Sequence, residues 1–156
     1  MVRQNRNRRV VIIGSDHAGF EAKSHIVDYL REKGYAESVI DLGTHSSDRV
    51  DYPDYGVAVA KALHDHQHAF GIVLCGTGIG ISISANKVKG ARAALCTTPF
   101  HAEMARKHND ANILALGGRT STLPEMESII DVWFNTEFEA GRHQRRVDRI
   151  HSLTEK

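Results

Sequence analysis

Short runs of apolar residues alternate with segments of helical periodicity along the whole chain. Five runs, rich in β-branched residues, are predicted to form strands at 10–13, 39–42, 70–74, 91–95 and 113–116. Between them, apolar side chains recur at helical spacing, as Ile26, Val27 and Leu30 do before Gly34 ends the helix. Strands without polar alternation are buried on both faces, so the pattern predicts a parallel sheet with helices on either side.

Proline and capping residues mark where the other helices begin. The expected starts are Pro53 or Asp54, about Ile81, Pro99 after the cap Thr98, Pro124, and Arg142 for a last helix at 142–153. We therefore expect an α/β fold with three layers, similar to a Rossmann fold. It would have a five-stranded parallel sheet, helices on both faces and a basic C-terminal helix.

The length and charge of the chain limit the classes of protein to consider. A chain of 156 residues, with no break in composition, fits one domain at 10–156, preceded by a disordered basic tail at 1–9. The net charge is +1, although arginines cluster in the tail and at 142–149. We therefore expect no nucleic-acid partner.

The same sequence favours a cytoplasmic protein. No apolar run is long enough to cross a bilayer, and the basic N-terminus lacks the apolar core of a signal peptide. Two cysteines, Cys75 and Cys96, make no disulfide framework, which is typical of a reducing compartment. We expect no membrane partner.

Polar residues follow the first, third and fifth predicted strands. They are Ser15, Asp16 and His17, the segment 75–80, and Gly117, Gly118 and Arg119. In open parallel sheets, ligands bind beyond the carboxyl ends of the strands, so these segments are the candidate site.

A glycine-rich loop follows the third strand. Gly76, Gly78 and Gly80 alternate with Thr77 and Ile79 before a helix, and such a loop can direct several backbone N–H groups at one anion. The spacing matches neither the dinucleotide fingerprint nor the P-loop, which carries a lysine.

Cys75 stands where this loop begins and has two interpretations. Its thiolate, favoured by a helix N-terminus, can remove a proton from carbon while the loop amides stabilise the resulting oxyanion. Alternatively, it is a small buried residue that closes a strand, as most free cysteines are. These residues leave both interpretations open. Cys96 has no such loop, and we expect it to be structural.

The histidines and their neighbours also allow two interpretations. Asp16 and His17 can reach a ligand, which we favour, or Asp16 can cap the helix that begins near Gly19. His108 and its neighbour Asn109 end a helix, where a structural role is favoured from the residues alone. Three further histidines, His64, His66 and His68, supply no complete ligand set, so we expect no metal site and no cofactor.

The last helix carries four arginines: Arg142, Arg145, Arg146 and Arg149. A planar guanidinium suits phosphate, and Arg119 can add another donor. A basic helix is more often a solvated face, so phosphate binding is a hypothesis at this point.

Six short motifs, in order along the chain, carry a resemblance to a known family. They are Gly14-Ser-Asp-His17, Asp51-Tyr-Pro53, Cys75-Gly-Thr-Gly-Ile-Gly80, Ala85-Asn-Lys87, His108-Asn-Asp110 and Gly141-Arg-His-Gln-Arg-Arg-Val147. Between about Arg9 and His151 the chain resembles ribose-5-phosphate isomerase type B, in a group with the galactose-6-phosphate and allose-6-phosphate isomerases. The resemblance implies interconversion of ribose 5-phosphate and ribulose 5-phosphate through a cis-enediolate, without a metal.

The resemblance also implies a role for each site residue. Cys75 would be the base, Thr77 a hydroxyl that helps to move protons, and His108 the group that opens the sugar ring. The remaining implied residues bind substrate (Asp16, His17, Tyr52, Gly76, Gly78, Ile79, Gly80 and Asn109) or phosphate (Arg119, Arg142 and Arg146). Family members that use a glutamate base carry it where this chain has Ile81, so the chain resembles the cysteine branch.

The resemblance also has an implication for oligomeric state, and two alternatives to the implied function stay open. It implies a homodimer or a dimer of dimers, with each site between two subunits. The substrate could instead be a six-carbon sugar phosphate, such as allose 6-phosphate or galactose 6-phosphate. A non-catalytic module that binds phosphosugars or nucleotides is the more remote alternative.

Overall fold

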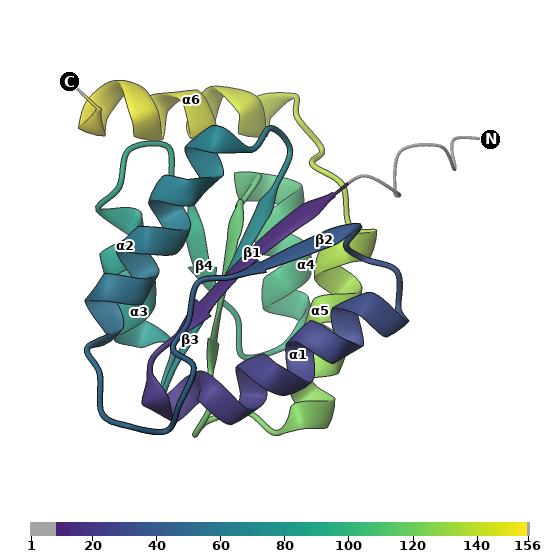
Figure 1. The fold of residues 1–156 in the computed structure, drawn as a ribbon. Helices are drawn as coiled ribbons and strands as arrows, with labels where there is room; N and C mark the ends of the chain where they lie inside the picture. Colours follow the sequence, from purple (N-terminus) through teal and green to yellow (C-terminus); the bar gives the residue numbers. More distant parts are fainter. Residues whose placement is uncertain (1–8, 156) are drawn as a thin grey trace.

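The fold is a five-stranded parallel sheet between two layers of helices, in a computed structural model that describes residues 9–155 (Figure 1). The strands are β1 (Val10–Ser15), β2 (Ser38–Asp41), β3 (Phe70–Cys75), β4 (Ala93–Leu95) and β5 (Ile113–Gly117). The helices are α1 (Phe20–Glu32), α2 (Tyr52–Ala62), α3 (Ile79–Asn86), α4 (Pro99–Asn109), α5 (Leu123–Asn135) and α6 (Arg142–Thr154), with short 3-10 turns η2 (His17–Gly19) and η3 (Leu63–Asp65). The predicted fold class is confirmed, including the basic last helix.

The strand order is β2-β1-β3-β5-β4, and every neighbouring pair is parallel. From β1 the chain moves to one side for β2 and to the other side for β3, so the order reverses between β1 and β3. In open α/β sheets a crevice forms at such a reversal, beyond the carboxyl ends of the strands. The ends of β1 and β3 therefore flank the expected binding crevice.

Both faces of the sheet are buried, which explains why the strands lack polar alternation. Val11 and Ile13 pack into the layer of α1, α4 and α5, around the fully buried Trp133. Ile12, between them in β1, points to the opposite layer and packs with Val59 of α2 and the α3 layer. Each strand thus contributes alternate side chains to two separate cores.

The central strands have a hydrogen-bonded strand on each side, whereas β4 lies at an edge of the sheet. Its free backbone groups are partly occupied by Asn86, the last residue of α3. The side-chain amide of Asn86 donates to the carbonyl of Ala93 over 2.9 Å, and its oxygen accepts from the Ala93 N–H over 2.8 Å.

An ion pair between a buried lysine and an aspartate that is open to solvent joins α1 to the end of β2. The Nζ of Lys23, whose residue is 1% exposed, lies 2.6 Å from both carboxylate oxygens of Asp41. Oδ1 of Asp41 also accepts the backbone N–H of Gly43. The pair therefore fixes the start of the long loop that leads from β2 to α2 and passes the carboxyl end of β1.

Helix α6 lies across the other end of the sheet. In Figure 1 the strands begin near α6 and point away from it. Its residue His151 contacts Arg92 just before β4, and Glu155 accepts the N–H of Gly90. The amino edge of the sheet is therefore covered by the basic helix.

Several predicted boundaries differ from the structure. Strand β4 begins two residues later than expected, because Ala91 closes a turn onto Val88 and the amide of Arg92 bonds to the side chain of Asn112. Helix α3 begins earlier, at Ile79, since Gly78 already adopts the left-handed conformation of its N-cap. Thr98 caps α4 as predicted, through the N–H of His101.

The predicted tail lies mostly outside the described residues, at 1–8. Arg9 belongs to the folded domain: its carbonyl accepts the N–H of Glu37, and its guanidinium lies 4.1 Å from the centre of the Phe70 ring. Within the part of the chain that the structure describes, no helix is long and apolar enough to span a bilayer.

Candidate active site

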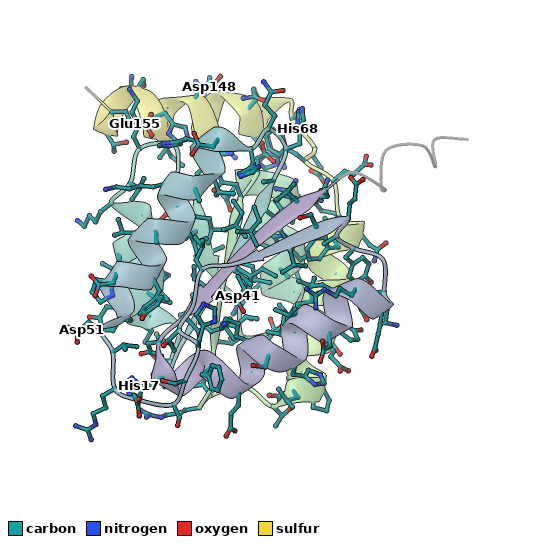
Figure 2. All side chains as sticks on the ribbon, viewed as in Figure 1. His17, Asp41, Asp51, His68, Asp148 and Glu155 are labelled. Atoms are coloured by element: carbon teal, nitrogen blue, oxygen red, sulfur yellow. The ribbon has the colours of Figure 1, made fainter. Side chains whose placement is uncertain are left out.

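The carboxyl edge of the sheet gathers most of the predicted site. The ends of β1, β3 and β5 carry Asp16 and His17, the loop after Cys75, and Arg119. The strands are in register, with Ser15 beside Leu74 and Cys75 beside Gly117. Figure 2 shows His17 and Asp51 at this end of the molecule, and Asp148 and Glu155 at the other.

Cys75 is buried, and its sulfur faces the glycine loop. The backbone N–H of Gly78 donates to Sγ over 3.2 Å. Gly78 has φ of 77°, a conformation that turns the loop back on the cysteine and that glycine adopts without strain. The last residue of β3 is therefore tied to the first turn of α3.

The N-terminus of α3 has no side-chain cap, because its N-cap is Gly78. The backbone N–H of Ile79 donates to the hydroxyl of Thr77 over 3.2 Å. The first hydrogen bond of the helix runs from the N–H of Ser82 to the carbonyl of Gly78. The first N–H groups of a helix have no partner within it. The first-turn amides after Ile79 are thus available to an anion next to the sulfur of Cys75.

Two predicted substrate residues pack directly on the loop. A Cβ added to Gly80 would meet the ring of Tyr52 at 2.6 Å, so glycine is required for that ring to lie there. A Cβ on Gly76 would lie 3.3 Å from a guanidinium nitrogen of Arg119. The structure therefore brings Tyr52, the loop and Arg119 together around Cys75.

Asp16 has the capping role that is the alternative to ligand binding. Its Oδ1 accepts the N–H groups of Ala18 and Gly19, which caps the turn η2, and its side chain is buried. His17 is half-buried, and its Nδ1 accepts the N–H of Val50 from the long loop over 3.2 Å. Both residues lie at the crevice, and a contact of either with substrate stays a prediction.

Four predicted site residues lie at the opposite edge of the sheet. His108 and Asn109 end α4, which starts beyond the carboxyl end of β4 and returns to the amino end of β5. Arg142 and Arg146 are exposed on α6, which covers that same edge. One chain therefore does not bring His108, Asn109 and these two arginines together with Cys75.

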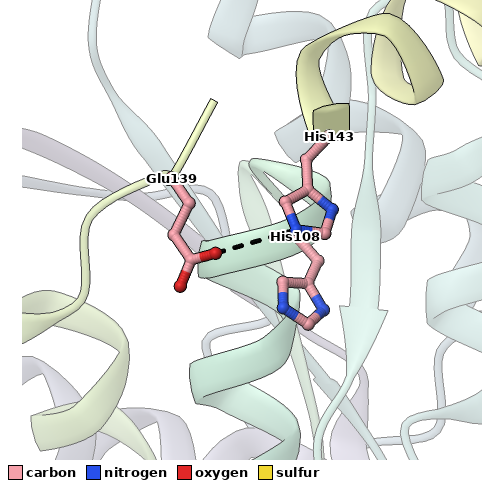
Figure 3. A group of neighbouring side chains, drawn as sticks. All are labelled: His108, Glu139 and His143. Carbon is pink, nitrogen blue, oxygen red and sulfur yellow. Dashed lines mark ion pairs between the residues drawn. The ribbon is translucent and has the colours of Figure 1, made fainter. Parts of the chain in front are cut away.

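His108 belongs to a cluster with Glu139 and His143, two residues that no pattern in the sequence marks as part of a site (Figure 3). The rings of His108 and His143 stack with centroids 4.2 Å apart and planes 12° apart. Nε2 of His143 lies 3.7 Å from Oε2 of Glu139 and makes no hydrogen bond. Burial, with His108 and Arg142 nearby, holds the pKa of His143 below its usual range.

The cluster offers three ligand atoms within 4.8 Å of one another. A histidine nitrogen binds a metal in the plane of its ring, at about 2 Å. Because the two ring planes are nearly parallel, no point lies close to both planes at that distance. This arrangement does not form a metal site unless a ring turns, and we assign none.

Only tertiary structure identifies His143 as part of this group. It stands in the motif that begins at Gly141, but its burial depends on the return of α6 to the end of α4. The signal available in the sequence was its position between Arg142 and Arg146, on the inner face of a helix whose other face is charged.

Comparison with known proteins identifies a family over most of the chain. The family described as ribose/galactose isomerase matches residues 11–150. Ribose-5-phosphate isomerase B of Escherichia coli (strain K12) is 45% identical over 146 residues, which are 94% of this chain and 97% of the relative.

Solved structures give the same result. Ribose-5-phosphate isomerase B of Clostridium thermocellum superposes with a TM-score of 0.88 and 51% identity, covering 92% of this chain and 96% of the other. The enzyme of Mycoplasma genitalium, solved with bound ribulose-5-phosphate, superposes with a TM-score of 0.89 and 39% identity, covering 95% of this chain and 97% of that one.

Proposed function

The chain belongs to the ribose/galactose isomerase family, and we propose that it interconverts ribose 5-phosphate and ribulose 5-phosphate without a metal ion. Membership makes it an aldose–ketose sugar-phosphate isomerase, so a non-catalytic binding module is no longer a competing explanation. The five-carbon substrate is that of the similar enzymes from Escherichia coli, Clostridium thermocellum and Mycoplasma genitalium. The chemistry must move a proton between C2 and C1 of the open sugar.

Cys75 is the base in this proposal. Its sulfur accepts the amide of Gly78, which holds the sulfur beside the glycine loop and the start of α3, and a thiolate is the form of cysteine that can take a proton. The thiolate takes the proton from C2 of the open aldose, and the resulting thiol returns it to C1. This hydrogen bond is the observation that carries the proposal. The carboxylate alternative is absent, since Ile81 is apolar and fully buried.

The glycine loop stabilises the cis-enediolate formed between the two proton transfers. The amides of Gly78 and Ile79 already bond to Sγ of Cys75 and to the hydroxyl of Thr77, so the donors in this proposal are the first-turn amides of α3 from Gly80 onward, beside the sulfur. Removing one donor from an oxyanion site of this kind costs about a hundredfold or more in rate. The hydroxyl of Thr77, which accepts from Ile79, is close enough to the loop to help in transferring protons between the sugar oxygens.

The remaining residues hold and open the sugar. His108 assists ring opening by general acid–base catalysis, and Asn109 binds the sugar beside it. Asp16, His17 and Tyr52 contact the sugar from the carboxyl edge. The guanidinium groups of Arg119, Arg142 and Arg146 bind the phosphate, which keeps the reacting carbons aligned with the sulfur.

These residues form one site only if two subunits meet. Cys75 and His108 lie at opposite edges of the sheet, and β5 alone spans about 17 Å between those edges. A single sugar phosphate does not bridge that length. We therefore propose a homodimer, or a dimer of such dimers, in which His108, Asn109, Arg142 and Arg146 of one subunit complete the crevice of the other.

The exposed apolar side chains support this pairing. Ile79 and Ile83 are one helical turn apart on α3 and are 52% and 56% exposed, next to the glycine loop. Ile150 and Leu153 are 44% and 58% exposed on α6. A two-fold contact that places α3 of one subunit against α6 of the other buries both pairs. Because the contact is two-fold symmetric, it also assembles two complete sites, each from one half of either subunit.

The proposal is tested by an isomerase assay on the purified protein with a chelator present. We expect ribose 5-phosphate to be converted to ribulose 5-phosphate, and the chelator to leave the rate unchanged. Allose 6-phosphate and galactose 6-phosphate are measured in parallel, because the family also includes galactose isomerases. Faster conversion of either six-carbon sugar would replace the proposed substrate, and loss of turnover with the chelator would refute the metal-free mechanism.

A further inference from the structure

We propose that His143 positions the imidazole of His108 for opening of the sugar ring, an inference that rests on the function proposed for His108. His143 itself does not touch the sugar. It lies in the first turn of α6, whereas His108 is near the end of α4, and the two rings are in direct contact.

The contact fixes the plane of the His108 ring. The His143 side chain is 7% exposed, and its ring lies parallel to His108 at a centroid distance of 4.2 Å. His108 is only half-buried, so part of its side chain stays accessible to a ligand or a partner subunit. A stacked platform removes rotation about the last side-chain bond, and an error of about 1 Å in placing such a group can cost a hundredfold in rate.

His143 acts as a flat surface rather than through its Nε2. Nε2 is buried and makes no hydrogen bond, and the nearest carboxylate oxygen, on Glu139, is 3.7 Å away. A hydrogen bond from a ring nitrogen requires about 3.2 Å or less. The shape of the ring is therefore what the stack uses, and an aromatic ring without nitrogen should replace it.

The position of His143 also affects the arginines proposed to bind the phosphate. It is flanked on α6 by Arg142 and Arg146, both exposed. One buried ring thus sets the distance between the proposed ring-opening imidazole on α4 and the two proposed phosphate ligands on α6. Loss of the ring would loosen that relation without removing any group that contacts the sugar.

The test compares His143→Phe, which keeps a flat ring, with His143→Ala, which removes it. Val147→Ala is the matched control, because Val147 is buried on the same helix one turn later and does not contact His108 in the stack. Circular dichroism and the oligomeric mass of each variant establish that it is folded.

Two measurements separate ring opening from proton transfer. If the isomerase opens the ring itself, the rate of conversion of ribose 5-phosphate rises in proportion to the enzyme concentration. If the isomerase needs the free aldehyde, the rate reaches a plateau at high enzyme concentration, because spontaneous ring opening then limits conversion. Ribulose 5-phosphate cannot close to a furanose, since its O5 is phosphorylated. Exchange of its C1 proton with D₂O, followed by NMR, therefore reports the enediolate step alone.

We expect His143→Ala to reach the plateau, with conversion of ribose 5-phosphate at least about tenfold below wild type at high enzyme concentration, and with C1 exchange unchanged. His143→Phe and Val147→Ala should stay within about threefold of wild type in both measurements. His108→Ala combined with His143→Ala should be no worse than His108→Ala alone.

Three results would overturn the positioning role. One is unchanged conversion by His143→Ala. Another is equal loss of conversion and exchange, which would place His143 in the proton-transfer step or in folding. The third is a His143→Phe variant as slow as His143→Ala, which would show that the nitrogen acts, through Glu139 or on the sugar. A wild-type protein that does not convert ribose 5-phosphate would instead refute the proposed function.

Discussion

The backbone N–H of Gly78 points at the sulfur of Cys75 from 3.2 Å. The contact joins the end of a central strand to the start of a helix, so the sulfur, the loop and the helix N-terminus form one rigid unit. Both groups are buried, and the loop around them is closed by the N–H groups of Gly118 and Arg119, which donate to Cys75 and Gly76. The geometry is therefore set before any substrate binds.

Replacing Cys75 by alanine should abolish isomerisation while leaving the fold intact. We expect the turnover number to fall by about a hundredfold to ten-thousandfold, the usual contribution of a positioned acid–base group. The measurement is ketose formation from ribose 5-phosphate with chelator present. Turnover near that of wild type would remove Cys75 as the base.

Cys96 provides the matched control. It is equally buried but has no glycine loop beside it, and burial raises its pKa to about 12, so it stays a neutral thiol at assay pH. Cys96→Ala should keep full turnover. Iodoacetamide at pH 8 should inactivate the protein by modifying Cys75 and should leave Cys96 unmodified, as peptide mass spectrometry can check.

Gly78→Ala should damage both stability and activity. Gly78 has φ of 77°, and an added Cβ would lie 2.6 Å from Leu95 and 2.9 Å from the backbone of Leu116. We expect a loss of more than about 2 kcal/mol in the free energy of unfolding and a turnover at least about a hundredfold lower. Urea denaturation and the isomerase assay measure the two effects.

Gly34→Ala separates backbone strain from steric overlap. Gly34 also has positive φ, of 68°, but an added Cβ meets nothing within 4 Å. Its replacement should cost about 1 kcal/mol with unchanged turnover. Similar losses for the two variants would contradict the role of close packing around Gly78.

The proposed split site predicts complementation between two inactive variants. Cys75→Ala keeps His108, and His108→Ala keeps Cys75. A mixed dimer therefore contains one site with both Cys75 and His108, and a second site that lacks both side chains. Mixed dimers, purified with two different affinity tags, should show about half of the wild-type activity. Mixed dimers as inactive as each parent would mean that each chain builds its site alone.

The pair of the buried Lys23 with Asp41 should be important for stability. Asp41→Asn keeps the acceptor for Gly43 but leaves the ammonium of Lys23 buried without a counter-charge. We expect a loss of about 3–5 kcal/mol in the free energy of unfolding, measured in urea. The pair of Lys107 and Glu103, in which both side chains are partly exposed, is the control, and Lys107→Met should leave the urea denaturation midpoint almost unchanged.

Acidification should destabilise the protein through His143. Its pKa is held below the usual value by burial and by His108, Arg142 and Arg146, against a smaller opposite effect of Glu139. Below about pH 6.5 this histidine binds a proton more readily in the unfolded chain than in the folded protein. The contribution of the neutral His143 to the free energy of unfolding is therefore complete above about pH 6.5 and is lost as the pH falls towards the lowered pKa. Between pH 7.5 and 5.5, Tm should fall less in His143→Phe than in wild type. An equal fall in both would contradict this assignment.

Local patterns predicted the elements of the fold but not the order of its outer strands. The runs around Ile12 and Ile72 are apolar because both faces are covered, and Thr98 carries a recognisable cap. Nothing within β4 or β5 specifies that β5 lies between β3 and β4. That order depends on how the crossover helices pack, which involves residues far apart in the sequence.

The same contrast holds for the site. Cys75 and the glycine loop were recognisable because their chemistry depends on neighbours in sequence. The separation of His108 from Cys75 was also implied, since a helix that follows a parallel strand returns to the amino edge before the next strand begins. The stack of His143 on His108 was not implied, because the whole of β5 and α5 lies between the two residues in the sequence.

The pairing of Asn86 with Ala93 has a consequence for how this protein avoids misassembly. An uncovered edge strand is a template on which other chains can add strands, which leads to fibrous aggregates. The carboxamide of Asn86 presents the same donor and acceptor pair as a peptide unit, so β4 already has a one-residue neighbour. Growth by strand addition at β4 is thereby disfavoured.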